Sequence, residues 1–270
     1  MKVVGFGDQV VDKYEHIRTM FPGGNALNFA VFSRKLGFNS AFVGVFGTDA
    51  SGDHVYKCIS ELGIDVSHCK KSEGENGCAR VSIIEGDRVF LGSNKGGVLR
   101  EAGHQLTEDD YRYLASFDLI HSSIYSYTDD ELARLSKMGS RISYDFSNDF
   151  SEEKLNTILP YVQYAFFSTS HLTEEGRKQL ADKALSFGCE LALCTCGSEG
   201  AYLYKHNLVY YQKPNLVEAI DTMAAGDAFI TCFILNYVVY GDVKYSLKKA
   251  ALFSSEQCMI QGSFGYGLHY

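Results

Sequence analysis

The sequence has few of the features that would divide it into separate parts or place it in a membrane. Only three of its 270 residues are proline, and no low-complexity stretch interrupts it, so no interdomain linker is evident. No apolar run is long enough to span a bilayer. The opening residues, Met1 to Gly5, run directly into an apolar strand without a signal peptide. These absences predict a single cytoplasmic domain, residues 1–270, with no membrane partner.

Positive charge is also scarce. The chain has 25 Lys and Arg against 33 Asp and Glu, which gives a formal net charge of −8. This balance argues against nucleic acid or an anionic membrane as the main partner. If the protein binds a phosphate-bearing ligand, its phosphate site must be built locally from backbone amides and Mg²⁺.

The eight cysteines form neither a CxxC pair nor a regular framework. Cys194, Cys196 and Cys232 lie in apolar segments, where cysteine behaves as a small hydrophobic residue. The spacing of Cys194 and Cys196 is not that of a zinc site. We therefore expect buried, reduced thiols rather than disulfides or a metal centre.

Apolar runs and amphipathic segments alternate through most of the chain. The apolar runs predict buried strands, and the segments between them predict helices. Such alternation indicates an α/β fold whose central, mostly parallel sheet is covered by helices on both faces. Strands are expected at 3–7, 41–46, 119–121, 142–146, 164–167 and 191–195, and helices at 25–36, 108–114, 129–137, 174–187, 225–240 and 245–261.

The centre of the sequence breaks this alternation. Residues 79–84 and 88–91 flank Glu85-Gly86-Asp87, a turn typical of a β-hairpin. Together with residues 11–14, this hairpin predicts a small antiparallel piece that stands off the main body.

The most informative segment is Ala224-Ala225-Gly226-Asp227, at the start of an almost wholly apolar helix. Small side chains there leave backbone N–H groups open at the positive end of the helix dipole, which favours an anion. A carboxylate beside such a site makes sense if Asp227 accepts the proton of a hydroxyl that attacks a γ-phosphate. The alternative is that Asp227 only stabilises the helix dipole, and this motif alone does not separate the two interpretations.

Two segments near the N-terminus suggest a polyol site. Gly23 and Gly24 precede a helix in which Asn28 lies one turn from the start, and Asp12 follows the first strand. Ligands of open α/β sheets bind at the carboxyl ends of the strands, where both segments are expected. Alternatively, Asn25 is a helix cap and Asp12 a turn residue.

A third motif, Thr195 to Gly200, follows a buried strand and carries two glycines three residues apart. Such a turn can lay its backbone and the Thr195 hydroxyl beside a nucleotide. Without the other motifs it would be only a tight turn.

In this order and spacing, the three motifs resemble those of the ribokinase-like (pfkB-type) carbohydrate kinases. Residues 221–227 match the family signature D-T-x-[GA]-A-G-D, and Gly23, Gly24 and Asn28 match its N-terminal glycine pair and asparagine. Residues 47–52 resemble its G-x-D-x-x-G turn, and residues 195–200 its T-x-G-x-x-G nucleotide turn. The resemblance spans nearly the whole chain and implies a three-layer ribokinase-like fold with a small β lid, formed by about residues 11–16 and 77–92.

The resemblance also implies roles for individual residues in an ATP- and Mg²⁺-dependent sugar kinase. Asp227 would be the catalytic base, and the backbone N–H groups of Ala225, Gly226 and Asp227, after Ala224, would form an anion hole for the phosphoryl group. Asp12, Gly23, Gly24 and Asn28 would bind the sugar, and Thr195, Gly197, Gly200 and Thr222 the nucleotide. The lid would also join two copies of the chain in a homodimer.

Within the family the sequence is most similar to the fructoselysine 6-kinases, which phosphorylate an Amadori compound. The shared features include residues 87–90, Gly97-Val98 and Tyr144-Asp145-Phe146-Ser147. Arg88 is then predicted to hold the carboxylate of a zwitterionic substrate, with a solvated hairpin charge as the alternative. Fructokinase, ribokinase or nucleoside kinase activity, or a non-catalytic sugar sensor, are the other functions open at this point.

Two departures from the family pattern matter. Ala224 replaces the commoner first glycine of the signature. Many relatives carry N-x-x-E where this chain has Ser168-Thr169-Ser170-His171, so the metal ligands are unknown. His171 is one candidate, and a surface histidine is the alternative.

Overall fold

An eight-stranded sheet forms the centre of the computed structural model, which describes the backbone of residues 1–84 and 87–270 and the side chains outside 83–88. The strand order is β14-β13-β12-β11-β10-β9-β1-β4. The strands from β4 to β12 run parallel, and β13 and β14 are antiparallel to their neighbours. The bounds are Lys2–Phe6 (β1), Asn39–Val43 (β4), Leu119–Ser123 (β9), Ile142–Asp145 (β10), Tyr164–Ser168 (β11), Leu191–Thr195 (β12), Ala201–Lys205 (β13) and Leu208–Gln212 (β14).

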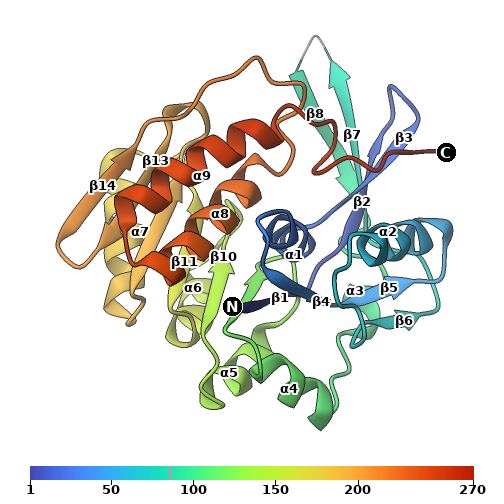
Figure 1. Cartoon of the computed structure of the whole chain (residues 1–270), viewed down its shortest axis with the longest axis horizontal. Coiled ribbons are helices and arrows are strands. Elements are labelled where there is room, and N and C mark those ends of the chain that lie inside the picture. The colour runs from blue at the N-terminus through green and yellow to red at the C-terminus, as the bar shows by residue number, and fades with distance from the viewer. Residues whose placement is uncertain (85–86) are drawn as a thin grey trace.

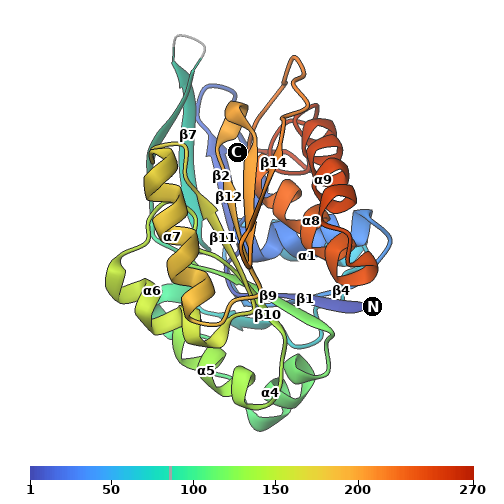
Figure 2. The same cartoon turned by 90° about the vertical axis from the view of Figure 1, so that its left-hand side faces the viewer.

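Helices cover both faces of this sheet (Figures 1 and 2). One face carries α1 (Asn25–Lys35), α8 (Ala225–Tyr240) and α9 (Val243–Gln257). The other carries α4 (Glu108–Ala115), α5 (Asp129–Lys137), α6 (Glu152–Ile158) and α7 (Glu174–Ser186). Each layer buries its own apolar cluster against the sheet. The predicted three-layer α/β fold with a mostly parallel sheet is confirmed.

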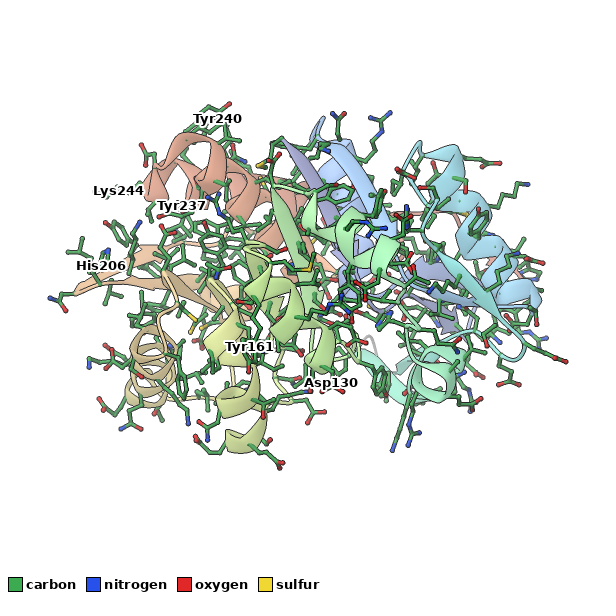
Figure 3. The ribbon with its side chains drawn as sticks, turned by 90° about the horizontal axis from the view of Figure 1, so that it is seen from below. Asp130, Tyr161, His206, Tyr237, Tyr240 and Lys244 are labelled. Carbon is green, nitrogen blue, oxygen red and sulfur yellow. The ribbon has the colours of Figure 1, made fainter. Side chains whose placement is uncertain are left out.

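Helix α8 lies in the interior because its sequence is apolar on every side. Its residues 228–235 are all buried, and it packs between α1 and α9. At the far end of the helix, viewed from below in Figure 3, the Tyr237 ring stacks on Phe233 with centroids 5.7 Å apart. The Tyr237 hydroxyl also donates a hydrogen bond to Glu190. The C-terminal end of the helix is therefore fixed relative to the sheet.

A second, five-stranded sheet stands beside the first, in the order β15-β3-β2-β7-β8, and we call it the small sheet (Figure 1). The sequence predicted β2, β7 and β8 but not β3, because Pro22 and Gly23 disfavour a strand. The expectation of a purely antiparallel piece is wrong, since β2 pairs in parallel with β7. The bounds are Val10–Tyr14 (β2), Thr19–Gly23 (β3), Cys78–Ile84 (β7), Asp87–Ser93 (β8) and Leu268–His269 (β15).

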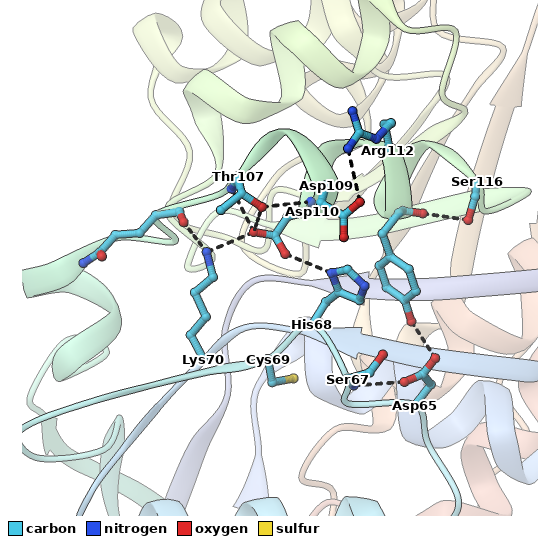
Figure 4. Close-up of polar contacts among 12 residues, drawn as sticks. Asp65, Ser67, His68, Cys69, Lys70, Thr107, Asp109, Asp110, Arg112 and Ser116 are labelled. Carbon is cyan, nitrogen blue, oxygen red and sulfur yellow. Dashed lines mark hydrogen bonds and ion pairs between the residues drawn. The ribbon is translucent and has the colours of Figure 1, made fainter.

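The remaining elements are the parallel pair β5 (Val45–Gly47) and β6 (Lys70–Ser72), with α2 (Ala50–Glu61) and α3 (Val98–Ala102). A polar cluster ties this region to α4 (Figure 4). Asp110 accepts a hydrogen bond from His68 Nδ1 at 2.9 Å and pairs with Lys70 Nζ at 3.0 Å. Burial alone would raise the pKa of Asp110, but hydrogen bonds from Thr107, His68 and Lys70 hold it well below its usual range. These contacts stabilise the fold away from the sheet edge where the ligand motifs lie.

All eight cysteines of the chain are free; six are buried, and Cys69 and Cys78 are half-buried. In the part of the chain that the structure describes, no helix combines the length and apolar character required to cross a bilayer.

Candidate functional site

The structure brings the two principal sequence motifs into contact. Asp227 lies in the first turn of α8, and Asn28 lies one turn into α1. Asn28 Nδ2 donates a hydrogen bond to Asp227 Oδ2 at 2.6 Å, although the residues are 199 positions apart. The other amide atom, Asn28 Oδ1, is buried and has no hydrogen-bond partner among the described atoms. A carboxylate and an open acceptor thus lie side by side where α1 and α8 begin.

The surroundings of Asp227 favour its protonated form. Burial raises the pKa of Asp227 to about 8, and the charges of Asp145, Asp8 and Asp12 act in the same direction, against the hydrogen bond from Asn28. A carboxyl group with its pKa near neutrality suits proton transfer to and from a hydroxyl. Such perturbed groups gather at functional sites.

Asp8 holds the start of α1, a role that the sequence analysis missed. Its carboxylate accepts hydrogen bonds from the backbone N–H of Asn25 at 2.7 Å and of Ala26 at 3.2 Å. The hydroxyls of Ser123 and Ser126 donate to it at 2.9 and 2.6 Å. Asn25 is therefore not the helix cap, because Asp8 caps α1 from the end of β1. The sequence feature that could have identified Asp8 is its position just after a buried strand.

Asp145 is a second carboxylate that the sequence analysis did not place in the site. It ends β10 and is only 4% exposed. Its carboxylate accepts hydrogen bonds from Asn25 Nδ2 and from the Ser147 backbone N–H, each at 2.8 Å. Burial raises the pKa of Asp145 to about 6 against these two hydrogen bonds, and the charge of Asp8 adds to the rise.

The predicted sugar-binding glycines lie where side chains would clash. Gly24 has φ = 115°, and a Cβ there would lie 2.8 Å from Gln9 Cα. A Cβ on Gly23 would lie 2.5 Å from Asp12 Oδ2, so the Asp12 carboxylate lies directly over this glycine. Asp12 belongs to strand β2 and not to a turn, and it is 6% exposed. Asp12, Gly23 and Gly24 are thus gathered beside the start of α1.

A cavity of about 530 Å³ adjoins the start of α8. It is lined by every residue that was predicted to bind the nucleotide, namely Thr195, Gly197, Gly200 and Thr222, and by Ala225 and Gly226. No side chain caps the first turn of α8, so its N-terminal dipole faces this cavity without a protein carboxylate or hydroxyl in the capping position. The cavity can therefore accept the phosphates of a nucleotide at the helix terminus.

Two of the glycines line the cavity for different reasons: the fold requires one of them, whereas the other leaves space for a ligand. A Cβ on Gly200 would lie 2.3 Å from the Gln212 carbonyl oxygen, so the fold itself demands glycine there. A Cβ on Gly226 would meet nothing within 4 Å, and no positive φ constrains the residue. The open space above Gly226 is consistent with a ligand that approaches the backbone closely.

Ala224, the departure from the signature, has backbone angles φ 57° and ψ 15° at the N-cap of α8. This is the left-handed region, which costs a residue with a Cβ about 1–2 kcal/mol. The commoner glycine of the signature fits this conformation without that cost. The start of α8 is therefore formed despite the strained backbone at Ala224.

Asp221, the first residue of the signature, joins two parts of the molecule. Its Oδ2 accepts hydrogen bonds from the Tyr14 hydroxyl at 2.6 Å and from the Gly262 N–H at 2.9 Å. Its Oδ1 accepts one from the Met223 N–H at 3.0 Å. Because Tyr14 belongs to β2, these bonds connect the small sheet to the loop that precedes α8.

Two further candidates remain, Arg88 for a substrate carboxylate and His171 for the metal. The Arg88 side chain lies outside the described residues. His171 is exposed, and Ser168 and Ser170 line the cavity. Among the described residues, no three His, Cys, Asp or Glu side chains are grouped so as to hold a metal ion. Mg²⁺ commonly binds through substrate phosphates and water with one or two carboxylates, so it does not require a dedicated cage of protein ligands.

A mostly parallel α/β fold with the buried Asp227–Asn28 pair beside a cavity of about 530 Å³ is consistent with the class of small-molecule kinases. The chain belongs to the pfkB family carbohydrate kinases, whose family model matches residues 2–263. It is an ATP-dependent sugar kinase.

Two curated relatives share substantial sequence with this chain. Fructosamine kinase FrlD of Bacillus subtilis (strain 168) is 37% identical over 271 residues, covering 100% of this chain and 95% of the relative. Fructoselysine 6-kinase of Escherichia coli (strain K12) is 31% identical over 232 residues, covering 86% of this chain and 87% of the relative.

The fold matches solved ribokinases. Arabidopsis thaliana ribokinase, complexed with ribose and ATP, has a TM-score of 0.81 at 19% identity, covering 98% of this chain and 94% of that one. Ribokinase from Thermotoga maritima has a TM-score of 0.78 at 18% identity, with the same coverage. The ribokinase-like fold predicted from the motifs is confirmed.

Proposed function

We propose that this sugar kinase uses ATP and Mg²⁺ to phosphorylate the 6-hydroxyl of fructoselysine or of a closely related fructosamine. The observation that carries the proposal is the contact between Asp227 and Asn28 at the uncapped start of α8, next to the 530 Å³ cavity. The acceptor class is supported by the names of the two relatives, a fructosamine kinase and a fructoselysine 6-kinase.

In this proposal Asp227 is the base. Its carboxylate takes the proton of the acceptor hydroxyl, whose oxygen forms a bond to the γ-phosphorus while the bond to the bridging oxygen of ADP breaks. Asn28 Nδ2, which donates to Asp227 Oδ2 at 2.6 Å, keeps the carboxylate in the orientation that this transfer needs.

Backbone groups at the start of α8 stabilise the phosphoryl group in transfer. The N–H groups of Ala225, Gly226 and Asp227 lie at the positive end of the helix dipole, and only small side chains precede them. Mg²⁺, when bound to the phosphates, neutralises part of their charge. Thr195, Gly197, Gly200 and Thr222 line the cavity that would hold the remainder of the nucleotide.

The sugar lies on the other side of Asp227. Asp12, Gly24 and Asn28 surround the start of α1, and the open acceptor Asn28 Oδ1 is available to a substrate hydroxyl or N–H group. A buried amide oxygen without a partner costs about 1–3 kcal/mol, which a bound donor would recover. The site therefore favours a substrate rich in hydrogen-bond donors.

A substrate screen tests the proposal. ADP release is measured with fructoselysine, fructose, ribose and adenosine at equal concentrations, and the product is characterised by NMR. We expect the highest kcat/KM with fructoselysine and a phosphate on O6. A higher kcat/KM with ribose, fructose or adenosine would assign the enzyme to another branch of the family.

A further inference from the structure

Two carboxylates of the site are held one helical turn apart. Asp145 is fixed by Asn25 at 2.8 Å, and Asp227 by Asn28 at 2.6 Å. Asn25 and Asn28 are three residues apart on α1, so their Cβ atoms are about 5–6 Å apart on one face of the helix. The two carboxylates therefore lie at neighbouring positions along the site.

The carboxylates around this site repel each other. The charge of Asp145 is the largest contribution from another group to the raised pKa of Asp227, and Asp8 and Asp12 add to it. A neutral sugar offers only hydroxyl donors and leaves this repulsion in place. A cation next to Asp145 reduces it, because attraction between opposite charges stabilises the ionised carboxylates.

Asp145 is the carboxylate best placed to face a substrate cation. Asp8 is occupied by four donors that fix the start of α1. Asp145 accepts two hydrogen bonds, whereas an ionised carboxylate has about four acceptor positions. Acceptor capacity therefore remains on Asp145, on the residue that is adjacent to the base.

An aromatic side chain flanks the same position. Tyr125 follows β9, is 40% exposed, and donates a hydrogen bond from its hydroxyl to Ser147 Oγ at 3.3 Å. Burial raises the pKa of Tyr125, and the charges of Asp149, Asp145 and Asp8 contribute to the rise, so the ring lies within the electrostatic reach of all three carboxylates. An aromatic face beside a carboxylate is a common receptor for an amine cation.

We propose that Asp145 determines substrate specificity by pairing with a cationic nitrogen at the end of the sugar opposite the hydroxyl that faces Asp227, with Tyr125 covering that nitrogen. The substrate class is that of 1-amino-1-deoxyketoses and their N-substituted derivatives. The inference rests on the proposed function and deepens it, since it assigns the selection of the amine to one residue. The unpartnered Asn28 Oδ1 beside Asp227 is an independent sign that a ligand donor completes this part of the site.

Pairing would also connect recognition to chemistry. A cation next to Asp145 offsets the negative charge that Asp227 experiences, so the pKa of Asp227 falls and its ionised, proton-accepting form becomes more populated. A substrate without the amine would leave the base largely protonated near neutral pH. Specificity would then appear in kcat as well as in KM.

The test compares fructose with 1-amino-1-deoxyfructose, which differ only in a hydroxyl or an ammonium group at C1. The wild type is expected to prefer the amine in kcat/KM. A hydrogen bond to a charged group contributes about 1.5–3 kcal/mol, so Asp145→Asn should lower this preference by about ten- to a hundredfold. The kcat/KM of fructose should not fall and should rise near neutral pH, because asparagine can still accept from the Ser147 N–H and loss of the Asp145 charge lowers the pKa of Asp227.

Asp182→Asn is the control. It removes an exposed carboxylate of α7 that pairs with Lys178, so the preference should stay at the wild-type value. An unchanged preference in Asp145→Asn, or an equal loss with both sugars, would overturn the inference while the kinase activity on fructoselysine stands. A wild type that phosphorylates neither amine but does phosphorylate ribose or fructose would refute the proposed function as well.

Tyr125 provides a second variant if Asp145→Asn does not fold. A cation–π contact contributes about 0.5–2 kcal/mol, so Tyr125→Leu should lower the amine preference by about two- to thirtyfold. Tyr125→Phe retains the aromatic face and should keep the preference. Equal preferences in the leucine variant and the wild type would contradict the placement of the cation.

Discussion

Asp227→Asn removes the charge and the proton affinity of the base but keeps the size and shape of its side chain. The amide oxygen of the introduced asparagine can still accept the hydrogen bond that Asn28 Nδ2 makes at 2.6 Å, so the start of α8 should keep its geometry. A positioned general base contributes about 10²–10⁴-fold to the rate. We therefore expect kcat to fall by that factor, equivalent to about 3–5 kcal/mol of activation free energy, while ATP affinity is retained.

The pH dependence follows from the same residue. The base acts in its ionised form, and its pKa in the free enzyme is raised to about 8, so kcat/KM for the sugar should rise with pH and level off above this value. The folded-state pKa lies above the unfolded-state value, so the stabilising contribution of the protonated carboxyl is present below about pH 4 and is lost as the pH rises through about 8. Asparagine cannot ionise, and Asp227→Asn should therefore be at least as stable as the wild type at pH 9.

Three measurements test these expectations. Steady-state ADP release gives kcat and its pH dependence, calorimetry gives the affinity for ATP, and thermal unfolding gives the stability. Asp242→Asn is the control, since Asp242 caps α9 through the Tyr245 N–H at 3.0 Å and asparagine is an equally good cap. The control should match the wild type in kcat and melting temperature. Turnover within about threefold of the wild type in Asp227→Asn would refute the role of this carboxylate as base.

Four further variants test the site and its support. Ala224→Gly should raise the free energy of unfolding by about 1 kcal/mol, and the melting temperature by about 2–4 °C, because it relieves a positive φ of 57°; an unchanged melting temperature would contradict this strain. Gly226→Ala should raise KM for ATP without loss of stability, whereas Gly200→Ala should unfold at lower urea concentration because its Cβ meets the Gln212 carbonyl at 2.3 Å. Asp8→Ala should cost at least about 2 kcal/mol in urea unfolding, since a helix cap and two buried hydroxyl contacts are lost together; a smaller loss would show that other groups hold α1.

The sequence was sufficient for the main elements because their signals are local. The apolar run of α8, the glycine pair before α1 and the buried strands β9 to β12 were each placed within a few residues of their bounds in the structure. The hairpin β13–β14 was missed although its signal was present, since two runs rich in tyrosine and leucine are separated by only two residues. The two-residue strand β15 has no sequence pattern of its own.

The carboxylates Asp8 and Asp145 were missed for a different reason. Each follows a strand, but their approach to Asp227 depends on the order in which β1, β9 and β10 pair. That order is a property of the assembled sheet and not of any short segment. Likewise, the homodimer through the small sheet stays a prediction, because it depends on a second copy of the chain.

The pairing of β15 with β3 has a practical consequence for anyone who produces this enzyme. The last residues of the chain form an edge of the small sheet, where Leu268 pairs with Met20, whereas the first residues enter β1 at the end of the sheet remote from the ligand motifs (Figure 1). An affinity tag or fluorescent fusion at the C-terminus would therefore extend from that sheet edge and disturb its neighbours. A fusion ahead of β1 would instead extend from the end of that strand opposite Asp8 and the start of α1.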